Sequence, residues 1–174
     1  MPTYDARSAE CLIYTFKDGL LARLAHDLKL CASELSITVD DAASTVSARV
    51  DTRGVQVVSF RRDGRDDPRA LGGFERSQIE GNVHRDVLDS ARFPEARFVS
   101  TAVTGSGDGF TVQGLLTLHG RTAALTIPVR RLGDRYLATV TLVQSRFGIK
   151  PYSAALGALK VRDEVTVTLS IPVA

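Results

Sequence analysis

The feature that most constrains this chain is a period of two in its apolar residues. Within residues 110–118, apolar side chains occupy one face and polar side chains the other. The same alternation recurs over residues 45–50, 125–130, 136–142 and 165–171. Successive side chains of a β-strand point to opposite faces. The pattern therefore predicts strands with one face on a core and the other in water.

Weaker alternation adds strands near residues 10–17, 28–39, 55–60 and 96–103, for a total of about eight or nine. Short breaks at 105–109, 119–120 and 133–134 contain glycine and have the length of hairpin turns, which indicates antiparallel neighbours. Within residues 28–39 the apolar positions change phase. We therefore expect a bulge or bend near Ser33–Glu34.

Helix is predicted in only one or two short segments. In residues 77–89, three apolar residues form one helical stripe, and Ser77 and Glu80 have the spacing of a capping box. A second short helix is expected over 19–25, and a single turn around 153–156 that ends at Gly157. The charged stretch 61–73 is interpreted as a solvated connection, with a lid or partner loop as the alternative.

Antiparallel strands with one apolar face hide that face by stacking two sheets or by closing a barrel. The chain has 174 residues, 44% hydrophobic and 24% charged, which is the ordinary composition of a globular domain. We therefore expect one domain over residues 1–174. Eight strands enclose a lumen that is filled by side chains or holds one small ligand. Periodicity alone does not decide between a filled lumen and a lumen that binds a ligand.

Charge and hydropathy argue against several classes of protein. The net charge is only +2, so a broad basic surface for nucleic acid is not expected. No apolar run approaches the roughly 18 residues of a membrane-spanning helix. The first ten residues lack the apolar stretch of a secretory signal, and we therefore expect a cytoplasmic protein.

The residues that most often carry catalysis do not form a recognisable motif. His26, His84 and His119 lack the spacing of a metal site, and no G-x-S-x-G motif occurs. A metal-dependent enzyme built on these histidines is a less favoured alternative, and no metal, cofactor or catalytic residue is expected. Cys11 and Cys31 would meet if their strands paired as a hairpin about residue 21, but a reducing compartment favours free thiols.

Four segments carry a more specific signal. Residues 87–100 read VLDSARFPEARFVS and residues 114–129 read GLLTLHGRTAALTIPV; SRFGI follows at 145–149 and KVRDEV at 160–165. In this order the segments resemble the YceI-like family of lipid-binding proteins. The match is good from about residue 77 onward and weaker over 1–60.

The resemblance implies an all-β, eight-stranded, antiparallel, lipocalin-like barrel with one or two short helices. It also implies a non-catalytic protein that holds or transports an isoprenoid, an isoprenoid quinone or a fatty-acid-like chain in its lumen. The alternative is a filled barrel that acts as a structural or stress-response interaction protein. A homodimer would shield the mouth of the barrel, although no residue pattern indicates one.

The residues expected to face such a lumen are the apolar members of the alternating strands and one aromatic residue beyond them. They are Phe98, Val112, Leu116, Leu118, Ile127, Val140, Leu142, Phe147, Val167 and Leu169. A polar head group would meet side chains where a strand ends. The candidates for this polar rim are Gln144, Ser145 and Arg146.

Overall fold

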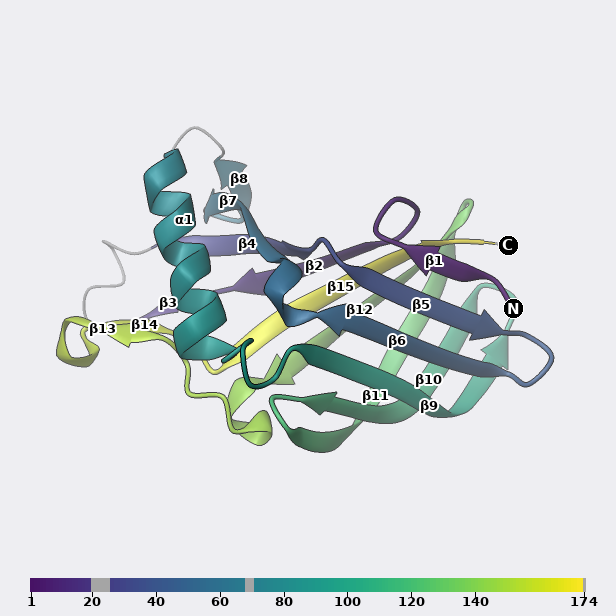
Figure 1. Cartoon of the computed structure of the whole chain (residues 1–174). Coiled ribbons are helices and arrows are strands. Elements are labelled where there is room, and N and C mark those ends of the chain that lie inside the picture. Colours follow the sequence, from purple (N-terminus) through teal and green to yellow (C-terminus); the bar gives the residue numbers. More distant parts are fainter. Residues whose placement is uncertain (20–25, 68–70, 174) are drawn as a thin grey trace.

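The computed structural model describes residues 1–19, 26–67 and 71–173. Within these ranges the chain is all-β with one α-helix, α1 (Gly73–Asn82), which continues into a π-helical turn at Val83–Val87 (Figure 1). The first strands are β1 (Thr3–Asp5), β2 (Glu10–Thr15), β3 (Lys17–Asp18), β4 (Asp27–Ala32), β5 (Leu35–Asp40), β6 (Thr45–Asp51), β7 (Val55–Arg62) and β8 (Arg65–Asp67). The later strands are β9 (Glu95–Ser106), β10 (Gly109–Leu118), β11 (Arg121–Leu132), β12 (Arg135–Val143), β13 (Ser153–Ala154), β14 (Leu159–Val161) and β15 (Glu164–Pro172). Short 3-10 helices lie at Thr52–Gly54, Gln144–Phe147 and Ala155–Gly157.

Twelve strands form one curled antiparallel sheet, a half-barrel, in the order β1-β5-β6-β9-β10-β11-β12-β15-β2-β4-β7-β8. The three glycine-containing breaks are the turns that join β9, β10, β11 and β12, as predicted. β13, β14 and β3 form a small separate sheet beside α1. The chain termini lie at the opposite end of the half-barrel (Figure 1).

One kinked hairpin connects the two ends of the curled sheet. Its first arm is β4 and β5, which are separated at Ser33–Glu34, and its second arm is β6 and β7, which are separated at Thr52–Gly54. β5 pairs with β6, and β6 continues the sheet to β9; β4 pairs with β7 and continues the sheet to β2. The bend near Ser33–Glu34 is confirmed, since it lets the apolar residues on both sides of it face the same interior.

The predicted count of eight strands is wrong. The bend at Ser33–Glu34 divides the predicted strand 28–39 into β4 and β5, and the short strands β1 and β8 add to the two edges of the sheet. The charged stretch 61–73 is also not a simple connection. β7 continues through Arg62, and the chain turns at Asp63–Gly64 and returns as β8.

The half-barrel is open between β11 and β12, and a short helix covers the gap. β11 pairs with β12 only through Val129–Leu132, so the first part of β11 and the last part of β12 diverge. Phe147 and Ile149, at and just after the helix Gln144–Phe147, are 1% and 3% exposed. Gly148 has φ +71, and a Cβ there would lie 2.7 Å from Nε of Arg121 on β11. The segment therefore seals this part of the wall.

Helix α1 begins earlier than predicted and does not use the capping box. Its N-cap is Gly72, and Ser77 lies inside the helix. The carboxylate of Glu80 instead accepts a hydrogen bond of 2.8 Å from the backbone N–H of Val57. Arg76 donates to the Val57 carbonyl, and Nε2 of His84 lies 2.7 Å from the Val55 carbonyl. These side chains satisfy the edge of β7, which exposes unpaired backbone groups at this point.

Two other helical predictions have different outcomes. All but the first residue of the segment 19–25 lies outside the described residues. The turn expected near 153–156 is present as the 3-10 helix Ala155–Gly157, in which Gly157 has φ +87. In the described ranges, no helix has the length and apolarity needed to cross a membrane.

Candidate functional site

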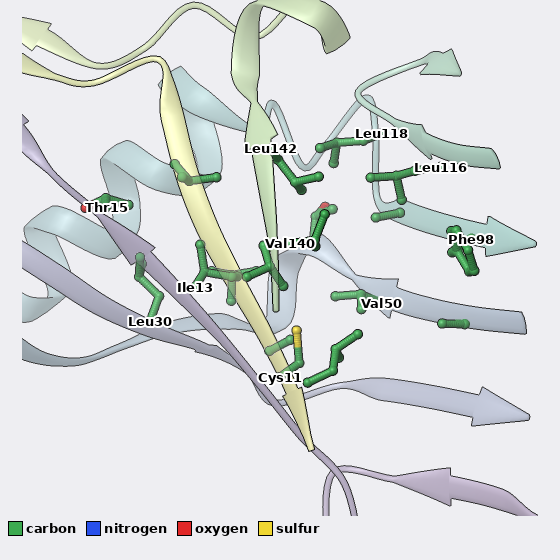
Figure 2. Close-up of a pocket in the computed structure, with 18 of the residues that line it drawn as sticks. Cys11, Ile13, Thr15, Leu30, Val50, Phe98, Leu116, Leu118, Val140 and Leu142 are labelled. Atoms are coloured by element: carbon green, nitrogen blue, oxygen red, sulfur yellow. The ribbon is translucent and has the colours of Figure 1, made fainter. Parts of the chain in front are cut away.

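The curled sheet and α1 enclose a cavity of about 910 Å³ (Figure 2). That volume lies near the upper end of the range for small-molecule sites, which is roughly 300–1,000 Å³. The wall reaches from Ile79 and Val83 on the α1 side to Tyr4 and Val173 at the end that carries the termini. The cavity therefore extends along the length of the strands.

All ten predicted lumen residues lie on the wall of this cavity. The structure places there Phe98, Val112, Leu116, Leu118, Ile127, Val140, Leu142, Phe147, Val167 and Leu169. Figure 2 shows several of them directed into the cavity, together with Cys11, Ile13 and Leu30. Because each strand of the wall contributes every second residue, the alternation in the sequence corresponds directly to the cavity wall.

The cavity is long relative to its width. On β15 alone, the wall residues run from Val165 to Ile171. At roughly 3.4 Å per residue, those six steps span about 20 Å. Most of the wall side chains are aliphatic or aromatic. An elongated apolar cavity accommodates a linear hydrocarbon chain better than a compact polar metabolite.

Polar side chains on the wall gather near α1. Asn82 Nδ2 donates a 3.3 Å hydrogen bond to the hydroxyl of Tyr152, which joins α1 to the segment before β13. Gln144 is 8% exposed, and its Nε2 donates to the carbonyl of Arg162 at 2.9 Å. His26 lies on the wall and stacks on Phe60, with 4.3 Å between ring centroids. This end of the cavity can form hydrogen bonds with a polar group.

Of the three rim candidates, only Gln144 lies on the cavity wall. Ser145 and Arg146 are exposed on the outside of the short helix. The hydroxyl of Ser145 donates to Asp163 at 2.5 Å, and its backbone N–H donates to the same carboxylate at 2.8 Å. The helical turn after β12 directs these two side chains away from the lumen, which strand alternation did not anticipate.

The two cysteines are free and face opposite sides of the sheet. Cys31 lies opposite Leu12 on β2, so the pairing is offset by one residue from a hairpin centred on residue 21. Cys11 lies on the cavity wall. Burial raises the pKa of the Cys11 thiol to about 12, which keeps it neutral at physiological pH.

The three histidines occupy separate environments. His26 stacks on Phe60, His84 bonds to the backbone of β7, and His119 packs against Phe93 with 4.3 Å between ring centroids. Within the part of the chain that the structure describes, no three potential metal ligands cluster.

Several wall residues that lie outside the long strands were not predicted from the sequence. Gln78 and Asn82 come from α1, Tyr152 precedes β13, and Leu159 lies on β14. The stripe of Ile79, Val83 and Val87 was the available signal for the helix, and all three residues line the cavity. The strands β13 and β14 are too short for periodicity to detect.

Comparison with known proteins identifies one family. A sequence profile of the YceI-like domain matches residues 25–173. A UPF0312 protein of Pseudomonas syringae pv. tomato is 40% identical over 77 residues, which cover 38% of this chain and 40% of the relative. A UPF0312 protein of Yersinia pestis is 33% identical over 102 residues, which cover 57% of this chain and 45% of the relative. The chain thus spans less than half the length of these curated relatives.

Solved structures share the fold. The crystal structure of BcnA from Burkholderia cenocepacia has a TM-score of 0.64 at 17% identity and covers 98% of this chain and 99% of BcnA. The YCEI protein of Campylobacter jejuni has a TM-score of 0.61 at 11% identity, with 82% and 81% of the two chains covered. These likenesses support the lipocalin-like architecture of the half-barrel.

Proposed function

The chain belongs to the YceI-like family, and from that premise we propose that it is a non-catalytic protein that holds one long apolar lipid in its cavity. The ligand class is an isoprenoid, an isoprenoid quinone or a fatty-acid-like chain, carried for sequestration or transport. The observation that supports this most directly is the elongated apolar cavity of about 910 Å³.

The energetics of burial favour a chain-like ligand. Each methylene group transferred from water to an apolar environment contributes about 0.8 kcal/mol. A wall of valine, leucine and isoleucine side chains offers such an environment along about 20 Å of β15. The alternative is a barrel that is filled by its own side chains and acts only as an interaction protein. It is not favoured, because the side chains of the wall leave the cavity of about 910 Å³ unfilled.

The chemistry of the wall favours binding over catalysis. The thiol of Cys11 faces the cavity, and its raised pKa of about 12 leaves almost no thiolate at neutral pH. The polar groups near α1 are engaged with one another or with the backbone. Their arrangement suits the orientation of a ligand.

The direct test is the ligand content of the purified protein. A native mass spectrum is recorded beside a mass spectrum of the organic extract. The proposal predicts a bound mass of about one lipid per chain, either after purification or after incubation with an isoprenoid quinone or a fatty acid. An apo mass that persists after incubation with both lipids contradicts it. A homodimer and a cytoplasmic location remain predictions. The same native mass spectrum tests whether the protein is a homodimer.

A further inference from the structure

The elements α1 and the small sheet lie together at one end of the molecule (Figure 1), and each region carries a large apolar side chain that is exposed. Phe74, in the first turn of α1, is 85% exposed, and Leu156, in the turn between β13 and β14, is fully exposed. Exposed side chains of this size contribute nothing to the core. Placed on two separate elements at one end, they fit an apolar partner that meets this end.

The turn that carries Leu156 is held in an unusual conformation. Ala155 and Leu156 have φ values of 50° and 55°, in the left-handed region that residues with a Cβ rarely adopt. Ala154 and Leu159, on either side of this turn, line the cavity. The backbone therefore directs Leu156 outward from a segment whose neighbours face inward, which suggests a role for the exposed side chain.

Lysine is concentrated at the same end. Of the four lysines in the chain, Lys17 is on β3, Lys150 precedes β13 and Lys160 is on β14. Asp18 lies opposite Lys160 in the small sheet, Asp27 accepts a hydrogen bond from the backbone of Lys17, and α1 carries Glu75 beside Arg76, so acidic groups offset part of this charge. A lysine stem packs along apolar material while its ammonium group stays at the polar surface.

We propose that this end docks on the surface of a phospholipid bilayer that contains anionic lipid. Phe74 and Leu156 enter the interfacial region, where apolar side chains are stabilised, and Lys150 and Lys160 lie at the level of the phosphates. Given the proposed function, on which this step depends, the lipid passes between α1 and the small sheet and enters the cavity without crossing bulk water.

The geometry of the cavity agrees with this direction of entry. Both elements that carry the protruding side chains also contribute to the wall, through Ile79 and Asn82 on α1 and Leu159 on β14. A hydrogen bond of 3.3 Å between Asn82 and Tyr152 joins α1 to the segment just before β13.

The test is co-flotation with vesicles of phosphatidylcholine, with and without phosphatidylglycerol. The double variant Phe74→Ser/Leu156→Ser is compared with Leu132→Ser, a matched control because Leu132 is 69% exposed at the end of β11. We expect binding of the wild type to the anionic vesicles, at least a tenfold loss in the double variant and no change in the control. Lys150→Gln/Lys160→Gln is expected to weaken binding to the anionic vesicles only.

Three results would overturn the docking proposal: no binding of the wild type, no loss in the double variant, or an equal loss in Leu132→Ser. Uptake of an apolar dye from solution, measured on every variant, reports the cavity separately and shows that the fold is intact. Dye uptake without vesicle binding rejects docking alone. Vesicle binding that depends on Phe74 and Leu156, without uptake of dye or lipid, rejects the proposed function alone.

Discussion

Replacing Val140 by tryptophan tests whether the cavity is the binding site. Val140 lies on β12 opposite Val167 and is directed into the cavity (Figure 2). Tryptophan has roughly seven more side-chain heavy atoms than valine, and each excluded methylene-sized group removes about 0.8 kcal/mol of binding free energy. The loss approaches about 5.6 kcal/mol, equivalent to a weakening of Kd by about four orders of magnitude.

The matched control is Thr141→Trp. Thr141 is the next residue on the same strand and is exposed on the outer face, opposite Thr166. Binding is measured by titration of an apolar fluorescent probe and of a fatty acid, and the melting temperature of each variant is recorded. We expect Val140→Trp to lose binding while it stays folded, and Thr141→Trp to bind as the wild type does. Wild-type affinity in a folded Val140→Trp, or an equal loss in both variants, would refute the reasoning.

Two further predictions concern the helix and the buried thiol. Glu80→Ala removes a charge-assisted hydrogen bond to a backbone N–H on the edge of β7, with an expected loss of about 2 kcal/mol and a fall in Tm of roughly 4–8 °C. Ser77→Ala is expected to change the free energy of unfolding by less than about 0.5 kcal/mol. If Ser77 acted as the N-cap of a capping box, the loss would be about 1 kcal/mol. Thermal melts of both variants distinguish the two cases. The Cys11 thiol has a folded pKa of about 12 against an ordinary value of 9.0, so the folded state binds more protons between those values. The free energy of unfolding should therefore fall as pH rises from about 9 toward 12. Burial also raises the pKa of the Cys31 thiol, so Cys11→Ser should show a shallower fall than the wild type in denaturant titrations, and equal slopes would contradict the prediction.

Much of the cavity wall could be predicted because it consists of long strands. Val112 and Leu116 on β10, and Val140 and Leu142 on β12, follow the period of two and all face the lumen. The phase change after Ala32 predicted the bend correctly. In such strands the alternation of apolar and polar residues matches the alternation of inward and outward side chains, so the sequence pattern alone identifies the residues that face the cavity.

The errors arise where tertiary contacts determine the local structure. Ser77 and Glu80 have the spacing of a capping box, but Glu80 is used by the edge of β7, a contact between residues 23 positions apart. Ser145 leaves the strand pattern because the chain turns into a short helix at Gln144. The strand count was too low partly because β1 and β8 have three residues each, which is too short for periodicity to detect.

The position of β2 in the sheet has a consequence for how the protein is made. β2 pairs on one side with β15, where Ile13 lies opposite Val167, and on the other side with β4. During synthesis, the edge of β2 that receives β15 stays unpaired until more than 150 further residues have left the ribosome. Closing a loop of that length is entropically slow, and contacts of this range characterise slow-folding β proteins. The cavity is thus completed only after translation has passed β15, and a nascent chain has no enclosed space in which to trap a lipid prematurely.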